Sequence, residues 1–201
     1  MAIIVEHDKR KREILDKALD VFVEEGYEDA TFQKISDRCG ITRTTLYLYF
    51  KNKREIFVWS IKQLTEELEA ALQKVIADTA VAIDERFRRM LNKILDSCVE
   101  NQKLFTVILT YLLQIQKTGK DPDVRVRRRI VRLRHLLSTV YIEGMKGGIF
   151  RKLPVKDVNE ILYGLIESVI FRLAILGRSK VDDLRSALML TVDTLLVNPV
   201  Y

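Results

Sequence analysis

The sequence predicts an all-α protein from three observations. Only 3 of the 201 residues are proline and 8 are glycine, the residues that interrupt helices most strongly. Apolar residues recur at intervals of three and four over long segments, as on the buried face of a helix. No long segment alternates β-branched and polar residues as a half-buried strand would. A chain of this length can bury a substantial core, as one large domain or as a small domain joined to a larger one.

The first helix is expected from Arg12 to Glu25. Its apolar stripe comprises Ile14, Leu15, Ala18, Leu19 and Phe22. This stripe should pack under the helices that follow. Gly26 should end the helix, because glycine readily adopts backbone angles that other residues avoid.

Two short helices around a tight turn are expected between Ala30 and Lys53. Thr31 can cap the first helix, and Thr42 can cap the second. Gly40 stands where the chain must leave the first helix in a left-handed conformation. The apolar residues of this segment are Phe32, Ile35 and Cys39 on the first helix, Ile41 in the turn, and Leu46, Tyr49 and Phe50 on the second.

The second short helix has two unlike faces. Its inward face is apolar, whereas its opposite face carries hydrogen-bonding side chains, namely Arg43, Thr44, Thr45 and Tyr47. A helix with one side to bury and one side for hydrogen bonding, placed after a tight turn, has the spacing of a helix-turn-helix.

At these residues the chain resembles the TetR family of bacterial transcriptional regulators. The resemblance rests on Glu24–Tyr27 (EEGY), Ala30–Thr31, Gly40–Thr42 (GIT), Thr45–Phe50 (TLYLYF) and Lys51–Lys53 (KNK). It covers about the first sixty residues, and the remainder is similar only in length and helical character. Ser36 departs from the family, which usually has alanine there. The resemblance implies a three-helix DNA-binding domain over residues 1–53, then a larger helical effector-binding and dimerisation domain over 54–201, with about nine helices.

The resemblance also implies roles for the residues of this motif. Candidates for contacts with base edges are Arg43, Thr44 and Gln33, and Thr45 could contact bases or phosphates. Candidates for phosphate contacts are Thr31, Thr42, Tyr47, Tyr49 and Lys53. Arg43 would favour guanine through paired hydrogen bonds, at about 1–3 kcal/mol of discrimination. Between Thr31 and Ser60, bases outnumber acids, which predicts a basic face suited to phosphate.

Residues 8–12 form a short basic segment (DKRKR) with two interpretations. It could be the solvated start of the first helix, or an arm that reaches DNA phosphates or the minor groove. His7 lies beside it, with no neighbouring residue that indicates catalysis or metal binding.

A long amphipathic helix is expected from Lys53 to about Asp78. Its apolar positions are Phe57, Ile61, Leu64, Leu68, Ala71 and Val75. A coiled coil is one interpretation, but a connecting helix that packs on the next domain is preferred, because partner helices follow in sequence. The segment Thr79–Asp84 interrupts the pattern and is expected to be a hinge between domains.

Five further helices are expected, at about 84–101, 104–116, 124–145, 155–176 and 181–197. The second of these is apolar around most of its circumference, which predicts a central position. Ten residues of these helices could surround an apolar cavity or form a close-packed core: Phe87, Met90, Ile94, Phe105, Leu109, Leu112, Leu137, Tyr141, Tyr163 and Phe171. The family resemblance favours a cavity for a small, largely apolar effector, with polar contacts from Tyr111, Tyr141, Tyr163 or His135.

An arginine cluster lies on the helix expected at 124–145, comprising Arg125, Arg127, Arg128, Arg129, Arg132 and Arg134. The alternatives are a solvated helix face, a site for an anionic effector, a patch for an acidic partner, and an accessory DNA contact.

The last two helices are expected to form the dimer interface. The apolar arc of the first is too wide for one neighbour, and Gly164 and Ser168 would let another backbone approach. An isologous four-helix bundle is the family's usual arrangement. The predicted interface residues are Ile161, Gly164, Leu165, Ser168, Leu184, Leu188, Val192 and Leu195.

The sequence favours a regulator over an enzyme. It has no metal-ligand cluster, no Ser-His-Asp or Cys-His arrangement with useful spacing, no nucleotide-binding loop, and no residues that call for a cofactor. Cys39 and Cys98 are expected to be buried free thiols in a reducing cytoplasm, and no apolar run is long enough to span a membrane. We therefore expect a cytoplasmic homodimeric repressor that binds a palindromic DNA operator and is released by its effector. The alternative is a helical scaffold protein without sequence-specific DNA recognition.

Overall fold

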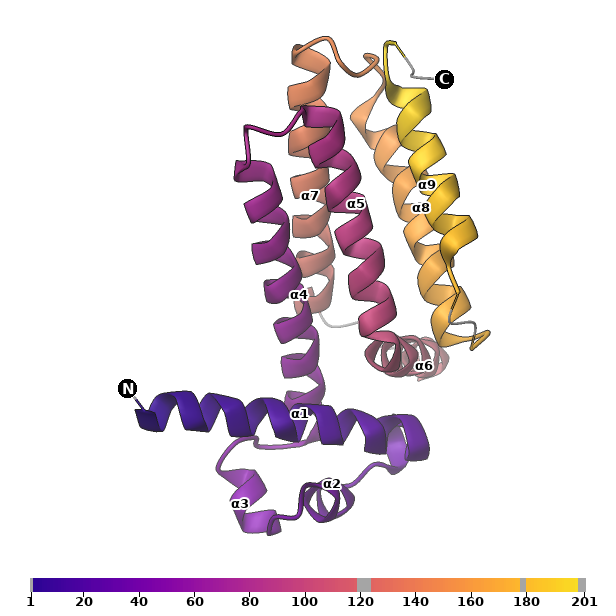
Figure 1. Cartoon of the computed structure of the whole chain (residues 1–201). Helices are drawn as coiled ribbons and strands as arrows, with labels where there is room; N and C mark the ends of the chain where they lie inside the picture. The colour runs from indigo at the N-terminus through magenta and orange to yellow at the C-terminus, as the bar shows by residue number, and fades with distance from the viewer. Residues whose placement is uncertain (1, 119–123, 178–179, 199–201) are drawn as a thin grey trace. The chain divides into compact units, whose positions relative to one another are not determined.

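The computed structural model describes residues 2–118, 124–177 and 180–198, except for the side chains of 2–5, 115–116, 118 and 124–130. Figure 1 shows the described helices, and the predicted all-α fold is confirmed. They are α1 (Ala2–Asp29), α2 (Phe32–Cys39), α3 (Arg43–Tyr47), α4 (Lys53–Ala77), α5 (Ile83–Glu100), α6 (Gln102–Thr118), α7 (Val124–Lys146), α8 (Val155–Ala174) and α9 (Asp182–Leu195). Within these ranges, the extended pairing is a single isolated antiparallel bridge between Phe150 and Leu196.

The chain divides into two compact units. The first comprises Met1–Leu64 and Lys103–Pro122, and the second comprises Thr65–Gln102 and Asp123–Tyr201. Helix α4 therefore continues from the first unit into the second. The predicted hinge at Thr79–Asp84 was wrong, because this break lies inside the second unit, between α4 and α5. An interruption in the apolar pattern marks the end of a helix, but it does not reveal whether the two helices share a core.

In the first unit, α1 packs on α2, and the predicted apolar stripe of α1 is largely buried. Ile14, Ala18 and Phe22 are buried, together with residues of α2, α3 and the start of α4. Helix α1 begins at Ala2, ten residues before the predicted start, because no breaker precedes Arg12. Gly26 has non-helical angles (φ 80°, ψ 159°) and kinks the chain before a last helical turn to Asp29.

Helix α6 is less buried than its composition predicted. Among its described side chains, Leu104 and Val107 are buried, whereas Leu113 is exposed and most of the others are half-buried. Most of α6 belongs to the first unit, where the Tyr111 ring packs against the rings of Tyr27 and Phe57 at 4.6 and 4.8 Å between centroids. The predicted central position of this helix was therefore wrong.

In the second unit, α5 contacts α7, α8 and α9, which lie beside it in Figure 1. Phe87, Met90 and Leu91 of α5 have no exposed surface, nor do Leu137 and Val140 of α7. A helix that is buried by several neighbours supplies the centre of a bundle core. The centre of this unit is therefore α5 rather than α6.

A buried arginine ties three helices of the second unit together. Arg86 of α5 donates hydrogen bonds to the backbone oxygen of Ile76, near the end of α4, at 3.0 Å and to the Glu143 carboxylate of α7 at 2.9 Å. The carbonyls of the last turn of a helix lack helical donors. Arg86 therefore satisfies one carbonyl near the end of α4 while it joins α5 to α7.

Candidate DNA-binding surface

The helix-turn-helix is built on two capped helices, as predicted. The Thr31 hydroxyl accepts a hydrogen bond from the Lys34 amide at 3.2 Å, and the Thr42 hydroxyl accepts one from the Thr45 amide at 3.0 Å. Gly40 adopts the left-handed conformation (φ 64°, ψ 35°) between the two helices. Each feature satisfies or redirects backbone groups that a helix end leaves unpaired.

The inward face of the motif agrees with the prediction except at Phe32 and Tyr49, which are half-buried. Ile35, Leu46 and Phe50 have at most 1% of their surface exposed, and Cys39 is buried with them. Ser36, where the family usually has alanine, is fully buried, and its hydroxyl donates to the Gln33 backbone oxygen at 2.8 Å. The serine is therefore accommodated without an unpaired polar group in the core.

The outward face of α3 presents Arg43, Thr44 and Tyr47 to solvent. The Arg43 guanidinium donates a hydrogen bond to the Tyr47 hydroxyl at 3.2 Å. The Tyr47 ring lies 4.8 Å from the Phe32 ring, measured between centroids. Thr45 is half-buried, and its hydroxyl shares a 2.8 Å hydrogen bond with that of Thr42. This face offers one guanidinium and several hydroxyl groups for hydrogen bonding.

Three other candidate DNA contacts are engaged within the chain. Gln33 donates to the Asp37 carboxylate on the same helix at 2.7 Å. Lys53 donates to the backbone oxygens of Tyr27 and Glu28 at 2.8 and 2.6 Å. An ammonium group has three donors, so Lys53 retains little capacity for a phosphate. Tyr49 is half-buried and stacks on His7 of α1 at 4.8 Å between ring centroids.

The predicted basic face is weaker than the residue count indicated. Lys34 forms an ion pair with Glu25 at 2.6 Å, and Arg38 forms one with Glu24. The hydrogen bond from Arg38 lowers the pKa of the Glu24 carboxyl. Both acids lie on α1, whose C-terminal part folds against α2. Acids distant in sequence thus neutralise two of the bases, which leaves Arg43 as the guanidinium on the outward face of α3.

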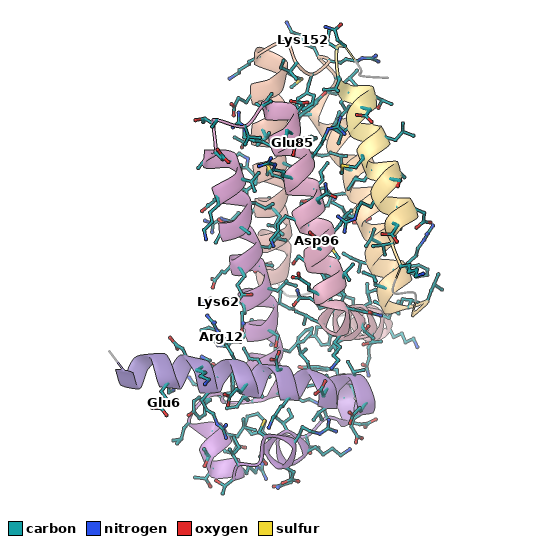
Figure 2. The ribbon with its side chains drawn as sticks, in the orientation of Figure 1. Glu6, Arg12, Lys62, Glu85, Asp96 and Lys152 are labelled. Atoms are coloured by element: carbon teal, nitrogen blue, oxygen red, sulfur yellow. The ribbon has the colours of Figure 1, made fainter. Side chains whose placement is uncertain are left out.

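The basic segment 8–12 lies inside α1 rather than in an extended arm. A helix distributes consecutive residues around its axis, and Figure 2 shows Arg12 and Glu6 pointing to different sides of α1. Lys11 turns inward, with its ammonium 3.4 Å from the centroid of the Trp59 ring, and burial is the main cause of its lowered pKa. The five residues therefore do not share one face.

The apolar residues predicted to surround an effector separate into three groups. Six lie buried in the second unit: Phe87, Met90, Ile94, Leu137, Tyr141 and Tyr163. Phe105, Leu109 and Leu112 lie half-buried on α6 in the first unit, as does the predicted polar contact Tyr111. The structure does not bring Phe171 into the buried group, because about half of its surface is exposed on α8.

The predicted polar contacts in the second unit differ in their surroundings. Tyr141 donates its hydroxyl proton to the Arg151 backbone oxygen at 2.8 Å, so this hydroxyl is already used within the chain. His135 is exposed on α7. Tyr163 is buried beneath the guanidinium of Arg134, which lies 4.4 Å from the ring centroid, and burial raises the pKa of its hydroxyl. Tyr163 is thus the predicted contact that combines burial with a neighbouring charge.

Two arginines of the predicted cluster have described side chains. Arg132 pairs with Glu69 of α4 at 2.8 Å, and Arg134 pairs with Glu160 of α8 at 3.0 Å. The side chains of Arg125, Arg127, Arg128 and Arg129 lie outside the described part of the chain. The two described arginines therefore help to join α7 to its neighbours.

The predicted dimer residues of α9 are core residues of a single chain. Leu188 and Val192 have no exposed surface, and Leu184 and Leu195 are also buried, so these four have little or no surface for a partner. The predicted residues of α8 are different, because Ile161 is 56% exposed, Gly164 and Ser168 are exposed, and Leu165 is half-buried. The prediction assigned the wrong face of α9, since an apolar stripe does not show which neighbour covers it.

The structure also reveals exposed apolar residues that the sequence patterns did not single out as surface. Phe171 and Ile175 continue the exposed face of α8 beyond Ser168, and Leu190 of α9 is 61% exposed. The contact of the Phe32 ring with Tyr47 of α3 and the stacking of His7 on Tyr49, two residues after α3, are further features that the sequence does not predict. For α9, the position of Leu190 two residues after Leu188 was the available signal, since residues two apart face different sides of a helix.

Both cysteines are buried free thiols, as predicted. Burial raises the pKa of the Cys98 thiol to about 12 and also raises the pKa of Cys39. No helix among the described residues is long and apolar enough to cross a membrane.

Comparisons with known proteins agree with this arrangement. Residues 14–58 match the family model described as "Bacterial regulatory proteins, tetR family". The fatty acid metabolism regulator protein of Bacillus subtilis is 24% identical over 167 residues, which are 81% of this chain and 84% of that protein. Among solved structures, the chain is similar to a TetR transcription regulator from Haloarcula marismortui, with a TM-score of 0.77, 21% identity, and coverage of 94% of this chain and 99% of that one.

The chain is also similar to the transcriptional regulator FadR from Bacillus subtilis, which was solved in complex with stearoyl-CoA. The TM-score is 0.65 at 22% identity, with coverage of 94% of this chain and 99% of that one. These relatives are regulators, which supports the expectation that the chain is not an enzyme. These matches support a DNA-binding transcriptional regulator of the TetR type, because residues 14–58 match the family model and the chain has the fold of solved TetR-family regulators.

Proposed function

We propose that the chain is a homodimeric repressor that binds a palindromic operator and is released from it by a small, largely apolar effector. The observation that carries this proposal is the exposed hydrogen-bonding face of α3. This helix belongs to a helix-turn-helix whose two helices are capped by Thr31 and Thr42 and whose apolar core is buried. Residues 1–53 are proposed as the DNA-binding domain, and residues 54–201 as the effector-binding and dimerisation domain.

Base recognition is assigned to Arg43, Thr44 and Gln33, with Thr45 able to contact bases or phosphates. Arg43 is the strongest candidate, because an arginine can form paired hydrogen bonds with guanine in the major groove. Gln33 would first have to leave its hydrogen bond with Asp37. Thr31, Thr42, Tyr47 and Tyr49 would fix the register through phosphates, which carry no sequence information. Lys53 would contribute less than its charge suggests, because it already binds two carbonyls of α1.

Dimerisation is assigned to the exposed face of α8, extended by Leu190 of α9. This face comprises Ile161, Gly164, Ser168, Phe171 and Ile175, with Leu165 at its edge. A Cβ atom placed on Gly164 would have no neighbour within 4 Å, so the backbone of a second helix could approach there. Two copies related by a two-fold axis would match a palindrome with half-sites about 34–36 Å apart or a multiple of that distance.

The effector site is assigned to the second unit, around the buried Phe87, Met90, Leu137 and Tyr163. FadR from Bacillus subtilis was solved with stearoyl-CoA, and the similar protein from the same species is named a fatty acid metabolism regulator protein. Long-chain acyl thioesters are therefore the first class of effector to test. Their anionic head group would suit the arginines of α7, among which Arg132 and Arg134 are described.

Release would follow from two states of the dimer. Helix α4 is continuous from Lys53 to Ala77 and belongs to both compact units. A shift of this helix in the second unit would therefore change the spacing of the two DNA-binding domains of the dimer. An effector can shift this equilibrium only to the extent that it prefers one state. This account fails if a bound effector leaves operator affinity and head spacing unchanged.

The first experiment is the selection of bound fragments from a random duplex pool, at low and moderate salt. Recovery of one palindrome, with affinity that falls steeply as salt rises, would support a dimeric sequence reader. The recovered operator would then be used to screen acyl thioesters for loss of binding. Salt-sensitive binding without a motif would instead indicate general charge contact, and no binding at either salt would favour the scaffold alternative.

Two matched arginine variants test the role of α3. Arg43→Ala should reduce the preference for the selected operator over random duplex by about fivefold to a hundredfold, because it removes a bidentate contact with guanine. Arg89→Ala removes an exposed arginine of α5 that pairs with Glu85 at 2.8 Å, and it should leave this preference unchanged. Equal preference in the two variants would exclude Arg43 as a base reader.

A further inference from the structure

Three side chains of the helix-turn-helix form a continuous chain of contacts that ends at the proposed base reader. Phe32 of α2 packs on Tyr47 of α3, and Tyr47 binds Arg43. We propose that Tyr47 is a positioning residue that aims the Arg43 guanidinium at a base, and that Phe32 holds Tyr47 in place. This inference rests on the proposed function, in which Arg43 reads guanine, and it replaces the phosphate contact assigned there to Tyr47.

The contact between Arg43 and Tyr47 orients the guanidinium. The two residues are four apart on α3, so their side chains lie on the same face. Arg43 donates to the Tyr47 hydroxyl at 3.2 Å, and its guanidinium carbon lies 5.7 Å from the centroid of the Tyr47 ring. The hydrogen bond uses one N–H group of the several that a guanidinium carries. The remaining N–H groups are sufficient for the paired contact with guanine.

The contact between Tyr47 and Phe32 restrains the tyrosine. The ring centroids are 4.8 Å apart and the ring planes are inclined by 42°. Tyr47 is 49% exposed, so contacts with α3 alone would leave its ring free to change rotamer. Phe32 is the first residue of α2 and follows the cap Thr31, whose position is set by its hydrogen bond to Lys34. The restraint on Tyr47 therefore starts from a part of the motif with a defined backbone.

A restrained arginine loses less conformational freedom when it binds a base. Long side chains carry substantial rotamer entropy, and part of this entropy is already lost in the free protein if Tyr47 holds the guanidinium. This smaller entropy cost raises affinity only for DNA sequences in which Arg43 binds its guanine. Positioning therefore predicts a loss of specificity when Tyr47 is changed, whereas a phosphate contact by Tyr47 predicts an equal loss on every sequence.

Tyr47→Phe in the full-length chain distinguishes these two roles. It keeps the ring and its contact with Phe32 but removes the hydroxyl that accepts from Arg43. Affinity is measured for the selected operator and for operators in which the guanine read by Arg43 is replaced. We expect the preference for guanine to fall about threefold to tenfold, with less than about a twofold change on the replaced operators. Equal losses on all operators would overturn the inference.

Two further variants sharpen the result. Phe32→Leu removes the ring that restrains Tyr47 and should lower the preference for guanine in the same direction, with a thermal midpoint measured to confirm that the domain is folded. Tyr49→Phe is the matched control, because it removes a tyrosine hydroxyl proposed to contact phosphate, and it should reduce affinity equally on all operators. A selective loss of guanine preference in Tyr49→Phe would contradict the assignment to Tyr47.

A double variant separates failure of this inference from failure of the proposed function. Tyr47→Phe combined with Arg43→Ala should show the guanine preference of Arg43→Ala alone, because a positioning residue has no effect without the group it positions. If Arg43→Ala retains full preference, the proposed base reader is wrong and the inference falls with it. If Arg43→Ala loses preference while Tyr47→Phe and Phe32→Leu retain it, the positioning role alone is wrong.

Discussion

The helix-turn-helix and the α8–α9 pair were predicted from the same kind of apolar spacing, but the structure agrees with the two predictions to different degrees. In the helix-turn-helix, the two caps, the left-handed glycine and four of the predicted inward residues lie as predicted, whereas Phe32 and Tyr49 are only half-buried. In α8 and α9, the helices form, but the residues of α9 assigned to a partner are buried within one chain.

The difference shows which properties a local pattern can determine. A cap or a left-handed turn involves backbone groups a few residues apart, so the sequence beside it contains the necessary information. A stripe of leucines predicts that a helix face will be buried, but it does not predict whether the same chain or a second copy will bury it. Leu188 is fully covered by the same chain, whereas 56% of the surface of Ile161 is left exposed.

The largest expected effect is on the free energy of unfolding, and it tests whether Leu188 of α9 belongs to the core of a single chain. Leu188→Ala should lower the free energy of unfolding by about 2–5 kcal/mol, because it leaves a cavity in a fully packed core. Leu190→Ala is the matched control two residues away, at a 61% exposed position. It should change the free energy of unfolding of the monomer by less than about 0.5 kcal/mol and should weaken self-association instead.

Urea denaturation measures the free energy of unfolding, and sedimentation of diluted samples measures self-association. The assignment of Leu188 to the core would be wrong if Leu188→Ala weakened self-association and left the unfolding of the monomer unchanged.

The next effect concerns stability at alkaline pH. The folded Cys98 thiol keeps its proton to a pKa of about 12, whereas an unfolded thiol ionises near a pKa of about 8.5. The stability that this group contributes is fully present below about pH 8.5 and is lost as pH rises toward 12, by about 1.4 kcal/mol per pH unit. Cys98→Ala should therefore show a shallower alkaline decline in the free energy of unfolding than the natural chain.

Urea titrations at several pH values between 8 and 10.5 give the slope of the free energy of unfolding against pH for the natural chain and for Cys98→Ala. Other groups, including Tyr27, whose pKa burial raises to about 12, also contribute to the alkaline decline, but they are common to both proteins. Identical slopes in the two proteins would show that the Cys98 thiol does not contribute.

A smaller effect is expected in the turn of the helix-turn-helix. Gly40→Ala should cost about 1–2 kcal/mol, because an alanine at φ +64° places its Cβ close to the backbone. No other atom lies within 4 Å of that Cβ, so the cost comes from the backbone conformation alone. Thr31→Ala should cost about 1 kcal/mol through the lost cap. Thermal denaturation measures both, and a neutral Gly40→Ala would contradict the local account of this turn.

The smallest effect is expected at Ser36. The hydroxyl bonds to the backbone oxygen of Gln33 in its own helix, which the helix tolerates without requiring it. Ser36→Ala removes the donor together with the need to satisfy it, so the free energy of unfolding should change by less than about 0.5 kcal/mol. Ser36→Val is the contrasting variant, since its larger side chain must enter a fully buried position. A large loss in Ser36→Ala would show that the hydroxyl has a role that its hydrogen bond does not reveal.

Several boundaries show the limits of the sequence patterns. The helices α5, α7 and α9 begin or end within a few residues of the predicted positions, because breakers and apolar periodicity coincide there. Helix α1 was predicted too short, because its first ten residues have no apolar stripe to mark them. The end of the apolar pattern after α4 predicts a hinge, but the end of a helix inside a domain produces the same pattern as a domain boundary.

The sequence by itself determined the helices, the caps, the turn and the polar face of α3, since each depends on residues close together in the chain. Only the tertiary structure decided that Glu24 and Glu25 neutralise bases of α2, that Lys53 binds carbonyls of α1, and that Phe32 packs on Tyr47. It also decided which apolar faces are covered within one chain. These outcomes depend on contacts between residues far apart in sequence or on different helices, whose partners are set by packing rather than by any spacing along the chain.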